Sequence, residues 1–264
     1  MTASSDSASF LKQTYFFLRN AIERRTHTEH FIVADKTNHE VLFSDGLMEV
    51  RYYPHQDDAP FELDGDAVNP QTRQHRTPIL LVPPLGVFHW IYDLMAERSW
   101  VRFLNAQGFQ VYLVNWGAPS RQDSDLSIDT YVNHWMRTAV AQVQQHSGQQ
   151  QVSLVGYCMG GLLTLLYAGA HGNGDIRNIV TIASPIDFHA SHAYGKVLSW
   201  VKRYSRRLPI PRAFSDSSRF HVPGDMLSVL FKMTNPLAGV VSYFDLVRNL
   251  SDRDYVKAHL TTRE

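Results

Sequence analysis

The middle of the chain alternates between short apolar runs and longer amphipathic segments. The apolar runs are Ile79–Val82, Val111–Val114, Val152–Val155 and Ile179–Ile182. Such runs are typical of strands that are buried on both faces. The segments between them repeat their apolar positions with helical spacing, over Asp93–Gln107, Ser127–Gln145 and Gly160–His171. Strands and helices in alternation predict an α/β fold, in which helices cover both faces of a mostly parallel sheet.

The residues before Ile79 follow a different pattern. Apolar residues recur with helical spacing over Phe10–Ile22, and three short runs typical of strands follow at His30–Val33, Val41–Phe43 and Leu47–Tyr53. The Asp45-Gly46 pair predicts a hairpin turn between the last two runs. We expect the helix to pack on its own domain. The alternative is an amphipathic helix that lies on a lipid or polymer surface.

The strand pattern ends after Ile182. Residues 185–264 contain helical patterns broken by prolines, which predicts a helical cap. The chain thus divides into an N-terminal helix and hairpin region (1–78), a core (79–184) and a cap (185–264). Because the chain ends inside a helix-like stretch, Tyr255–Glu264, we expect the cap to be truncated.

Composition narrows the class of protein. Hydrophobic residues make up 44%, which is enough for a full core, and the formal net charge of +0 argues against a nucleic-acid partner. No apolar stretch is long enough to span a bilayer, and no secretion signal begins the chain. A single cysteine excludes an internal disulfide and a multi-thiolate zinc site, and it fits a reducing, cytoplasmic location.

The most informative motif surrounds that cysteine. Gly156-Tyr157-Cys158-Met159-Gly160-Gly161 follows the apolar run Val152–Val155 and opens a helical segment. A strand, a sharp turn and a helix form the context of the nucleophile elbow G-x-S-x-G, here with Cys in place of Ser. The glycines are expected because side chains two residues either side would collide with a nucleophile in a strained conformation. We therefore predict that Cys158 is a catalytic nucleophile rather than a buried apolar residue.

A second motif predicts where an oxyanion would be held. Val82-Pro83-Pro84-Leu85-Gly86 ends the first buried run. In α/β-hydrolases the loop at this position supplies one backbone N–H to the oxyanion, and the residue after the nucleophile supplies the other. The candidate donors are therefore the backbone of Leu85 or Gly86 and that of Met159. His89, close to this loop, is a lesser candidate polar group with an expected packing role.

These motifs, with the blocks between them, resemble the polyhydroxyalkanoate synthases, α/β-hydrolase-fold acyltransferases with Cys in the lipase box. The resemblance is dense from about Ile79 to Ser184 and looser through Leu246–Leu250. The short N-terminal region is similar to that of the shorter synthase classes, which work with a partner subunit. The residues that carry the resemblance are Val82-Pro83-Pro84, Tyr92-Asp93-Leu94, Glu97-Arg98-Ser99, Arg102-Phe103-Leu104, Gly108, Val111–Val114, Trp116-Gly117 and Gly156–Gly161.

The resemblance implies that the chain makes polyester from 3-hydroxyacyl-coenzyme A. The cysteine thiolate would take the acyl group, and the hydroxyl of one unit would attack the thioester of another. The expected partners are therefore the acyl-coenzyme A substrate, the polyester chain, a partner subunit or second copy, and the surface of a polyester granule. No cofactor and no metal are expected, because no motif for a nucleotide or a metal is present.

The acid and the base of a catalytic triad are not identified. On this fold they follow two later strands, and no such strands are predicted after Cys158. His171 ends the nucleophile's own helix, and Asp187 is interpreted as a helix or turn cap. We therefore expect the acid and base beyond residue 264 and little activity from this chain alone. The remaining downstream histidines are interpreted as lid or cap residues: His189, His192, His221 and His259.

Two other functions stay open. A Cys-dependent esterase, thioesterase or depolymerase would share the fold and differ in using water as the acceptor. A non-catalytic protein that docks on granules or on a complete synthase would explain the missing acid and base.

Overall fold

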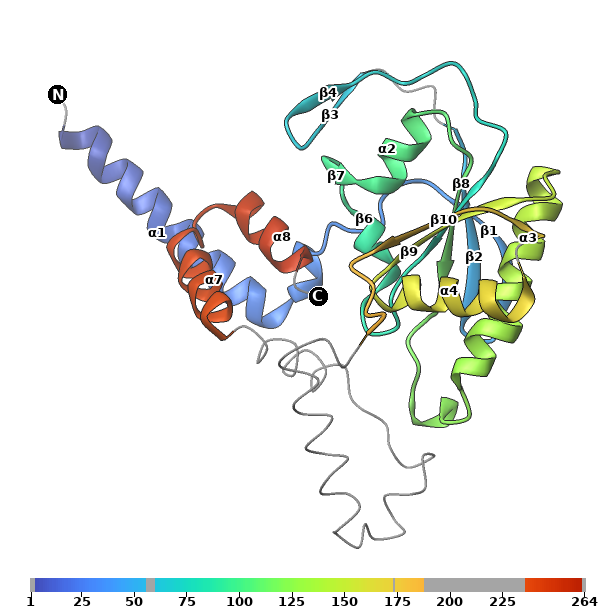
Figure 1. The fold of residues 1–264 in the computed structure, drawn as a ribbon. Helices are drawn as coiled ribbons and strands as arrows, with labels where there is room; N and C mark the ends of the chain where they lie inside the picture. The colour runs from blue at the N-terminus through green and yellow to red at the C-terminus, as the bar shows by residue number, and fades with distance from the viewer. Residues whose placement is uncertain (1–2, 56–59, 173, 188–235, 263–264) are drawn as a thin grey trace, which may run out of the picture.

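The computed structural model describes residues 3–55, 60–172, 174–187 and 236–262. A sheet of six strands forms its centre, in the order β1-β2-β8-β5-β9-β10. Four of these strands are parallel, while β2 runs antiparallel to both β8 and β1 (Figure 1). The strands are β1 (Glu40–Asp45), β2 (Met48–Tyr53), β5 (Ile79–Val82), β8 (Val111–Asn115), β9 (Val152–Tyr157) and β10 (Ile176–Ile182). Each of the four apolar runs is therefore a strand, and the predicted α/β fold is confirmed.

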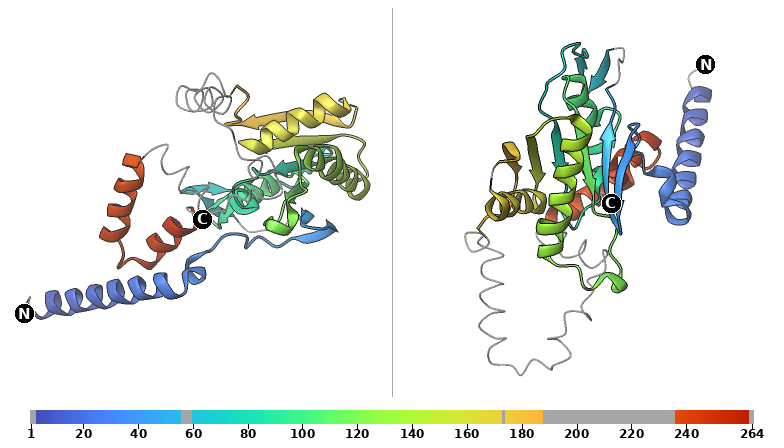
Figure 2. Two further views of the ribbon diagram at one scale, coloured as in Figure 1. Left: turned by 90° about the horizontal axis from the view of Figure 1, so that it is seen from below. Right: turned by 90° about the vertical axis from the view of Figure 1, so that its right-hand side faces the viewer.

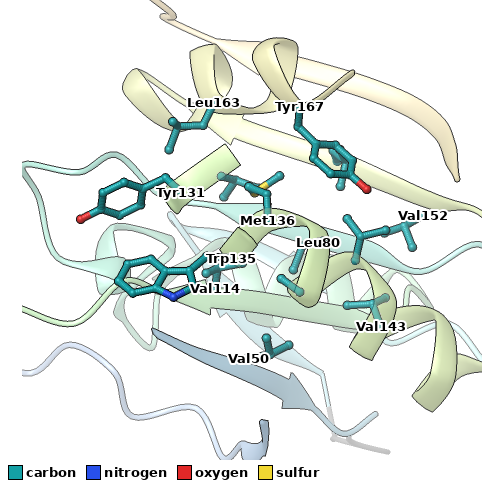
Figure 3. Packing of buried hydrophobic residues seen from close by; sticks show 14 of the residues in the cluster. Val50, Leu80, Val114, Tyr131, Trp135, Met136, Val143, Val152, Leu163 and Tyr167 are labelled. Carbon is teal, nitrogen blue, oxygen red and sulfur yellow. The ribbon is translucent and has the colours of Figure 1, made fainter. Parts of the chain in front are cut away.

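Side chains of the central strands alternate between two apolar layers. Leu80 and Val82 of β5 pack on the face covered by α3 (Arg137–Ser147) and α4 (Met159–His171). Ile79 and Leu81 pack on the opposite face, which α2 (Trp100–Ala106) covers. Figure 3 shows the first layer, where Trp135, Met136 and Leu163 meet the strands. Alternate side chains point to opposite faces of a strand, so a fully apolar strand requires both layers.

The helix predicted over Asp93–Gln107 begins later than expected. Two short antiparallel strands, β6 (Asp93–Met95) and β7 (Arg98–Ser99), precede α2. The buried Asp93 carboxylate accepts hydrogen bonds from the Thr37 backbone and hydroxyl and from the Ser99 hydroxyl. Ser99 also accepts from the Arg102 backbone N–H and so forms the N-cap of α2. These polar contacts keep residues 93–99 in the β6–β7 strand pair, so the helix starts only at Trp100.

Three further segments differ from their predictions. The run His30–Val33 is not a strand, because Thr28–Phe31 forms a 3₁₀ turn (η1) that buries Phe31 among helices. The polar segment over 54–77, whose prolines and glycine predict a loop, contains a small hairpin, β3 (Phe61–Leu63) and β4 (Asp66–Val68). The third predicted helix begins as a π-helical segment, η4 (Thr130–Met136), before it continues as α3.

The remaining short elements are the 3₁₀ turns η2 (His89–Tyr92) and η3 (Arg121–Asp123).

The first helix packs against the last two. α1 (Ala3–Thr26) confirms the predicted N-terminal helix, α8 (Arg253–Thr261) contacts it, and α7 (Pro236–Arg248) packs on α8 (Figure 2). Leu246, Leu250, Val256 and Leu260 surround Phe31 in a separate apolar cluster. Tyr15, Leu18 and Ile22 of α1 stay exposed, as do Tyr243 and Phe244 of α7. No helix in the described residues has both the length and the hydropathy that a membrane crossing requires.

An ion pair joins α1 to α8. Arg253 donates two hydrogen bonds to the Glu23 carboxylate, at 2.7 and 2.8 Å, and Asn20 donates to the Leu250 carbonyl. The hydrogen bonds from Arg253 lower the pKa of Glu23 from 4.5 to about 2, although desolvation acts in the opposite direction. The ionised carboxylate is thus the form that holds the two helices together.

The first turn of α4 lies directly against the end of β5. A Cβ atom at Gly160 would lie 2.0 Å from the Val82 carbonyl oxygen and 2.7 Å from that of Pro83. Both neighbours are backbone atoms, so they cannot rotate away. The close packing of this helix on the sheet therefore requires glycine.

We expect Gly160→Ala to destabilise the protein by about 1–3 kcal/mol or more, because the added methyl group overlaps backbone atoms of β5. Gly169→Ala is the matched control in the same helix, since a Cβ there meets nothing within 4 Å. The control should gain about 0.5–1 kcal/mol from helix propensity. Urea unfolding curves measure both changes, and equal midpoints for the two variants would contradict the described packing.

Acid should loosen α1 from α8. Because the pKa of Glu23 is lower in the folded chain than its ordinary 4.5, the ion pair stabilises the fold above pH 4.5 and is lost as the pH falls toward about 2. Protection of the α1 amides from hydrogen exchange, corrected for the intrinsic exchange rate at each pH, should therefore fall across this range in the native protein. In Glu23→Gln the corrected protection should already be low at pH 6 and should change little with acid.

Asp254→Asn is the control, because that exposed carboxylate pairs with Lys257 within α8. A native acid response in Glu23→Gln would show that other groups hold α1.

Candidate active site

Cys158 occupies a strained turn between β9 and α4. Its backbone has a φ of +52° and a ψ of −121°, a conformation that residues other than glycine rarely adopt. The Cys158 N–H donates to the Ile182 carbonyl at 2.8 Å, and its carbonyl accepts from the Gly161 N–H at 3.0 Å. These bonds hold the residue at the carboxyl edge of the sheet and at the N-terminus of α4.

The glycines of the motif allow close packing between the strand, the helix and the segment after β10. A Cβ at Gly156 would lie 2.4 Å from the Gly161 Cα, and a Cβ at Gly161 would lie 1.9 Å from the Ser184 hydroxyl oxygen. The clashes are therefore between the strand, the helix and the end of β10, and none of these nearest atoms belongs to Cys158. The glycines allow a narrow turn, and this turn positions Cys158 at the carboxyl edge of the sheet and the N-terminus of α4.

The thiol lies where a negative charge is favoured. Cys158 is half-buried, and Met159 is the first residue of α4. The N–H groups of a first helical turn have no acceptor within the helix, and the helix dipole is positive at that end. Among the residues that the structure describes, neither a histidine nor a carboxylate hydrogen-bonds to the Cys158 thiol. The site therefore offers a candidate nucleophile and a candidate oxyanion donor, and the described residues show no base that contacts the thiol.

The loop after β5 lies at the same edge of the sheet. β5 and β9 are parallel neighbours in which Val82 pairs with Gly156, so the loop that contains Leu85 and Gly86 starts beside the turn of Cys158. Leu85 is half-buried against the core, and Gly86 is exposed. The structure thus places Leu85, Gly86, Cys158 and Met159 at one edge, while their roles stay predictions.

Two aromatic residues anchor the start of this loop. The Trp116 indole N–H donates to the Pro83 carbonyl at 2.9 Å. The buried Tyr92 hydroxyl lies 3.2 Å from the carbonyl oxygens of both Val82 and Val155, and so connects β5 to β9. Burial raises the pKa of Tyr92, so it remains a hydroxyl donor. Both residues belong to blocks that carry the family resemblance, but no local sequence pattern predicts their contacts.

Buried charges surround the other end of the loop. His89 begins η2 directly after the loop, and its imidazole Nε2 lies 2.8 Å from Arg51 Nη1 and 3.1 Å from Asp35 Oδ2. Arg51 Nη1 also donates to Asp35 Oδ2 at 2.9 Å, and Arg51 donates twice to Glu49. Asn115, at the end of β8, donates to the same Glu49 carboxylate at 3.0 Å. His89 therefore joins a charged cluster of Asp35, Glu49 and Arg51, which goes beyond the expected packing role.

The charged forms of this cluster are strongly favoured. Desolvation alone would raise the pKa of Asp35, but hydrogen bonds and charges from His89 and Arg51 hold it well below its usual range. The pKa of Glu49 is also lowered, against its desolvation, by Asn115 and Arg51. The pKa of Arg51 is raised by the two carboxylates, although burial opposes this. The ion pairs thus offset the desolvation of each partner.

The downstream acid and base candidates do not meet the cysteine. His171 is exposed at the far end of α4, and His259 lies on α8 beside Tyr255. Asp187 is exposed beyond β10. His189, His192 and His221 lie outside the described residues.

An apolar cavity of about 630 Å³ lies next to the turn. Tyr157 and Ile182, the last residues of β9 and β10, form one wall, and Trp100 and Phe103 of α2 form another. Its lining is mostly apolar, with Asp64, Glu97, Arg98 and Ser99 as its polar members. Within the described ranges of the chain, no cluster of His, Cys, Asp or Glu side chains could hold a metal ion.

Comparison with known proteins agrees with this geometry. Residues 78–236 match the family model of the alpha/beta hydrolase fold. The poly(3-hydroxyalkanoate) polymerase subunit PhaC of Haloferax mediterranei is 29% identical over 239 residues, which cover 90% of this chain and 44% of that protein. The same subunit of Thiocystis violacea is 33% identical over 188 residues, or 70% of this chain and 50% of that protein.

The chain spans about half the length of these curated relatives. Among solved structures, an esterase from Rhodococcus sp. is similar with a TM-score of 0.39 and 14% identity, over 85% of this chain and 70% of that one. The resemblance to the polyhydroxyalkanoate synthases is confirmed by the curated relatives. With its parallel sheet, its strained turn after β9 and its match over residues 78–236, the chain belongs to the α/β-hydrolase fold family.

Proposed function

We propose that this chain carries the nucleophilic half of a polyester synthase, in which Cys158 accepts a 3-hydroxyacyl group from coenzyme A. The observation that carries the proposal is the cysteine at a φ of +52° on the N-terminus of α4. The names of the curated relatives support the polyester product. Cys158, Met159, Leu85 and Gly86 are the residues to which we assign the reaction.

The first step is acyl transfer to sulfur. The Cys158 thiolate attacks the thioester carbonyl carbon, and the carbonyl oxygen becomes negative. The backbone N–H of Met159 and that of Leu85 or Gly86 donate to this oxyanion. When the intermediate collapses, the bond to the coenzyme sulfur breaks, and the coenzyme leaves as a thiolate that takes up a proton. The products are free coenzyme A and an acyl-cysteine thioester.

The second step forms the polymer bond. The hydroxyl oxygen of another hydroxyacyl unit attacks the acyl-cysteine carbonyl, and the hydroxyl proton passes to a base. The bond to sulfur breaks, an ester forms and the Cys158 thiolate is restored. Cysteine suits the first step because one thioester is exchanged for another and because a thiolate is a strong nucleophile near neutral pH. It suits the second step because the thiolate is the leaving group when the ester forms. We do not assign the base or its acid partner to a residue.

The first step can be tested without the base. The reaction is run at about pH 9, because hydroxide and buffer base can take the proton of a thiol in place of an enzyme base. Incubation with 3-hydroxybutyryl-coenzyme A should add one hydroxybutyryl group to the peptide that contains Cys158, as measured by mass spectrometry. Cys158→Ala should abolish this acylation, and Cys158→Ser should slow it at least about 100-fold.

His171→Ala is the matched control, because this exposed residue ends the same helix. It should acylate at the native rate. Acylation at another residue, or none in the native chain, would overturn the proposal. Acyl-cysteine that is hydrolysed without forming ester oligomers would favour the thioesterase reading.

The wider setting of the reaction stays a prediction. It comprises a partner subunit or second copy, contact with a polyester granule and a cytoplasmic location. The exposed apolar residues of α1 and α7, among them Tyr15, Ile22 and Phe244, are the part of the described surface that such contacts would use.

A further inference from the structure

The loop that contains Leu85 and Gly86 is exposed between two buried ends. Val87 and Phe88 have exposed fractions of 37% and 39%, whereas His89 is buried. At its start, Pro83 is held by Trp116, and Val82 by Tyr92. A loop with an exposed middle keeps a defined backbone only as far as its ends are held.

The end of the loop is held by charge. Arg51 Nη1 donates to Asp35 Oδ2 at 2.9 Å, and His89 Nε2 lies within hydrogen-bond distance of both groups, 2.8 Å from Arg51 Nη1 and 3.1 Å from Asp35 Oδ2. The rest of the guanidinium is bound to Glu49, which fixes its orientation on β2. His89 thus has a rigid partner rather than a mobile side chain.

The contacts that hold the two ends of the loop both start from residues at the end of β8. Asn115 binds Glu49, and Glu49 binds Arg51, which binds His89. The next residue, Trp116, binds Pro83. Two consecutive residues, at the end of β8 and directly after it, therefore connect to the two ends of the loop through separate hydrogen bonds.

Asp35 shows that this arrangement is under strain. Its φ is +59°, which lies in the left-handed region that residues other than glycine seldom adopt. Its N–H donates to the Asp93 carbonyl at 2.9 Å. Strained residues persist only where surrounding contacts over-determine them. Here the ion pair with Arg51 and the contact with His89 supply those contacts.

We propose that Asp35, Arg51 and His89 are positioning residues that hold the Leu85–Gly86 backbone in place for the oxyanion. This inference rests on the proposed function, since it assigns these residues to the acyl-transfer step of Cys158. They touch neither substrate nor thiol in this role. They act through the loop.

Comparing two reactions of the same thiol tests the role. Transfer from a thioester needs the oxyanion donors, whereas alkylation by iodoacetamide displaces iodide and forms no oxyanion. In His89→Phe we expect acylation by 3-hydroxybutyryl-coenzyme A to slow about 10- to 100-fold, while alkylation stays within about twofold of native. His89→Gln, whose side-chain amide offers an acceptor to Arg51 and a donor to Asp35, should recover most of the acylation rate. Asp35→Asn should slow acylation in the same way, because asparagine tolerates the left-handed backbone but lacks the charge.

His146→Phe is the matched control. His146 is bound to the Tyr112 hydroxyl at 2.8 Å and lies at the end of α3 that leads into β9, away from the turn of Cys158. Its loss should leave both reactions of the thiol unchanged. A parallel loss of acylation and alkylation in His89→Phe would show damage to the turn itself and would overturn the positioning role. So would a native acylation rate.

A second measurement does not depend on activity. Amide hydrogen exchange over residues 85–88 should rise in His89→Phe and return toward native in His89→Gln. If the native chain is not acylated, the proposed function fails, and loop exchange then decides the anchoring alone. Unchanged exchange in His89→Phe would refute the anchoring even if acylation occurs.

Discussion

The close contact between the first turn of α4 and the carboxyl ends of β5, β9 and β10 is the constraint on which the site depends. Backbone meets backbone there, with Gly160 against Val82 and Gly156 against Gly161. This closeness forces the connection between strand and helix into a tight reversal, and the residue at its apex, Cys158, takes a conformation that costs about 1–3 kcal/mol. Packing of the whole sheet offsets that cost, so the conformation of Cys158 depends on the packing of the core.

The same contact explains why the loop after β5 needs its own supports. Its start is trapped against the helix, but its middle projects from the protein. Trp116 and Tyr92 hold the first residues through carbonyl groups. Beyond them a buried set of ion pairs replaces apolar packing, and such a set is stable only when its members are all present. The molecule thus combines an apolar support below the loop with a polar one beside it.

The sequence pattern predicts the elements that depend on local sequence. The four apolar runs became strands, and Gly156–Gly161 became a turn between a strand and a helix. The pattern misplaces the start of α2 because Asp93 is held by Thr37, far away in the chain, and accepts the hydroxyl hydrogen bond of Ser99, the N-cap of the helix. The run at His30 was misread because its burial comes from α7 and α8 rather than from a sheet.

The charged cluster could not be predicted for a related reason. Asp35, Glu49, Arg51 and His89 come from a linker, a strand and a 3₁₀ turn, and no spacing along the chain joins them. A polar residue in isolation is expected at the surface, and only the fold reveals that Arg51 and His89 are buried against the half-buried Asp35 and Glu49. The division into regions 1–78, 79–184 and 185–264 stays a prediction, although α1 and α8, from its first and last regions, are in contact.

The mutual dependence of Asp35, Arg51 and His89 limits which substitutions evolution accepts at these positions. Loss of any one leaves an unpaired charge or an unfilled donor in the interior, so intermediates that lack a single partner are disfavoured. Substitution at these positions should therefore be correlated across relatives, with the trio kept whole or exchanged as a set for apolar residues of similar volume.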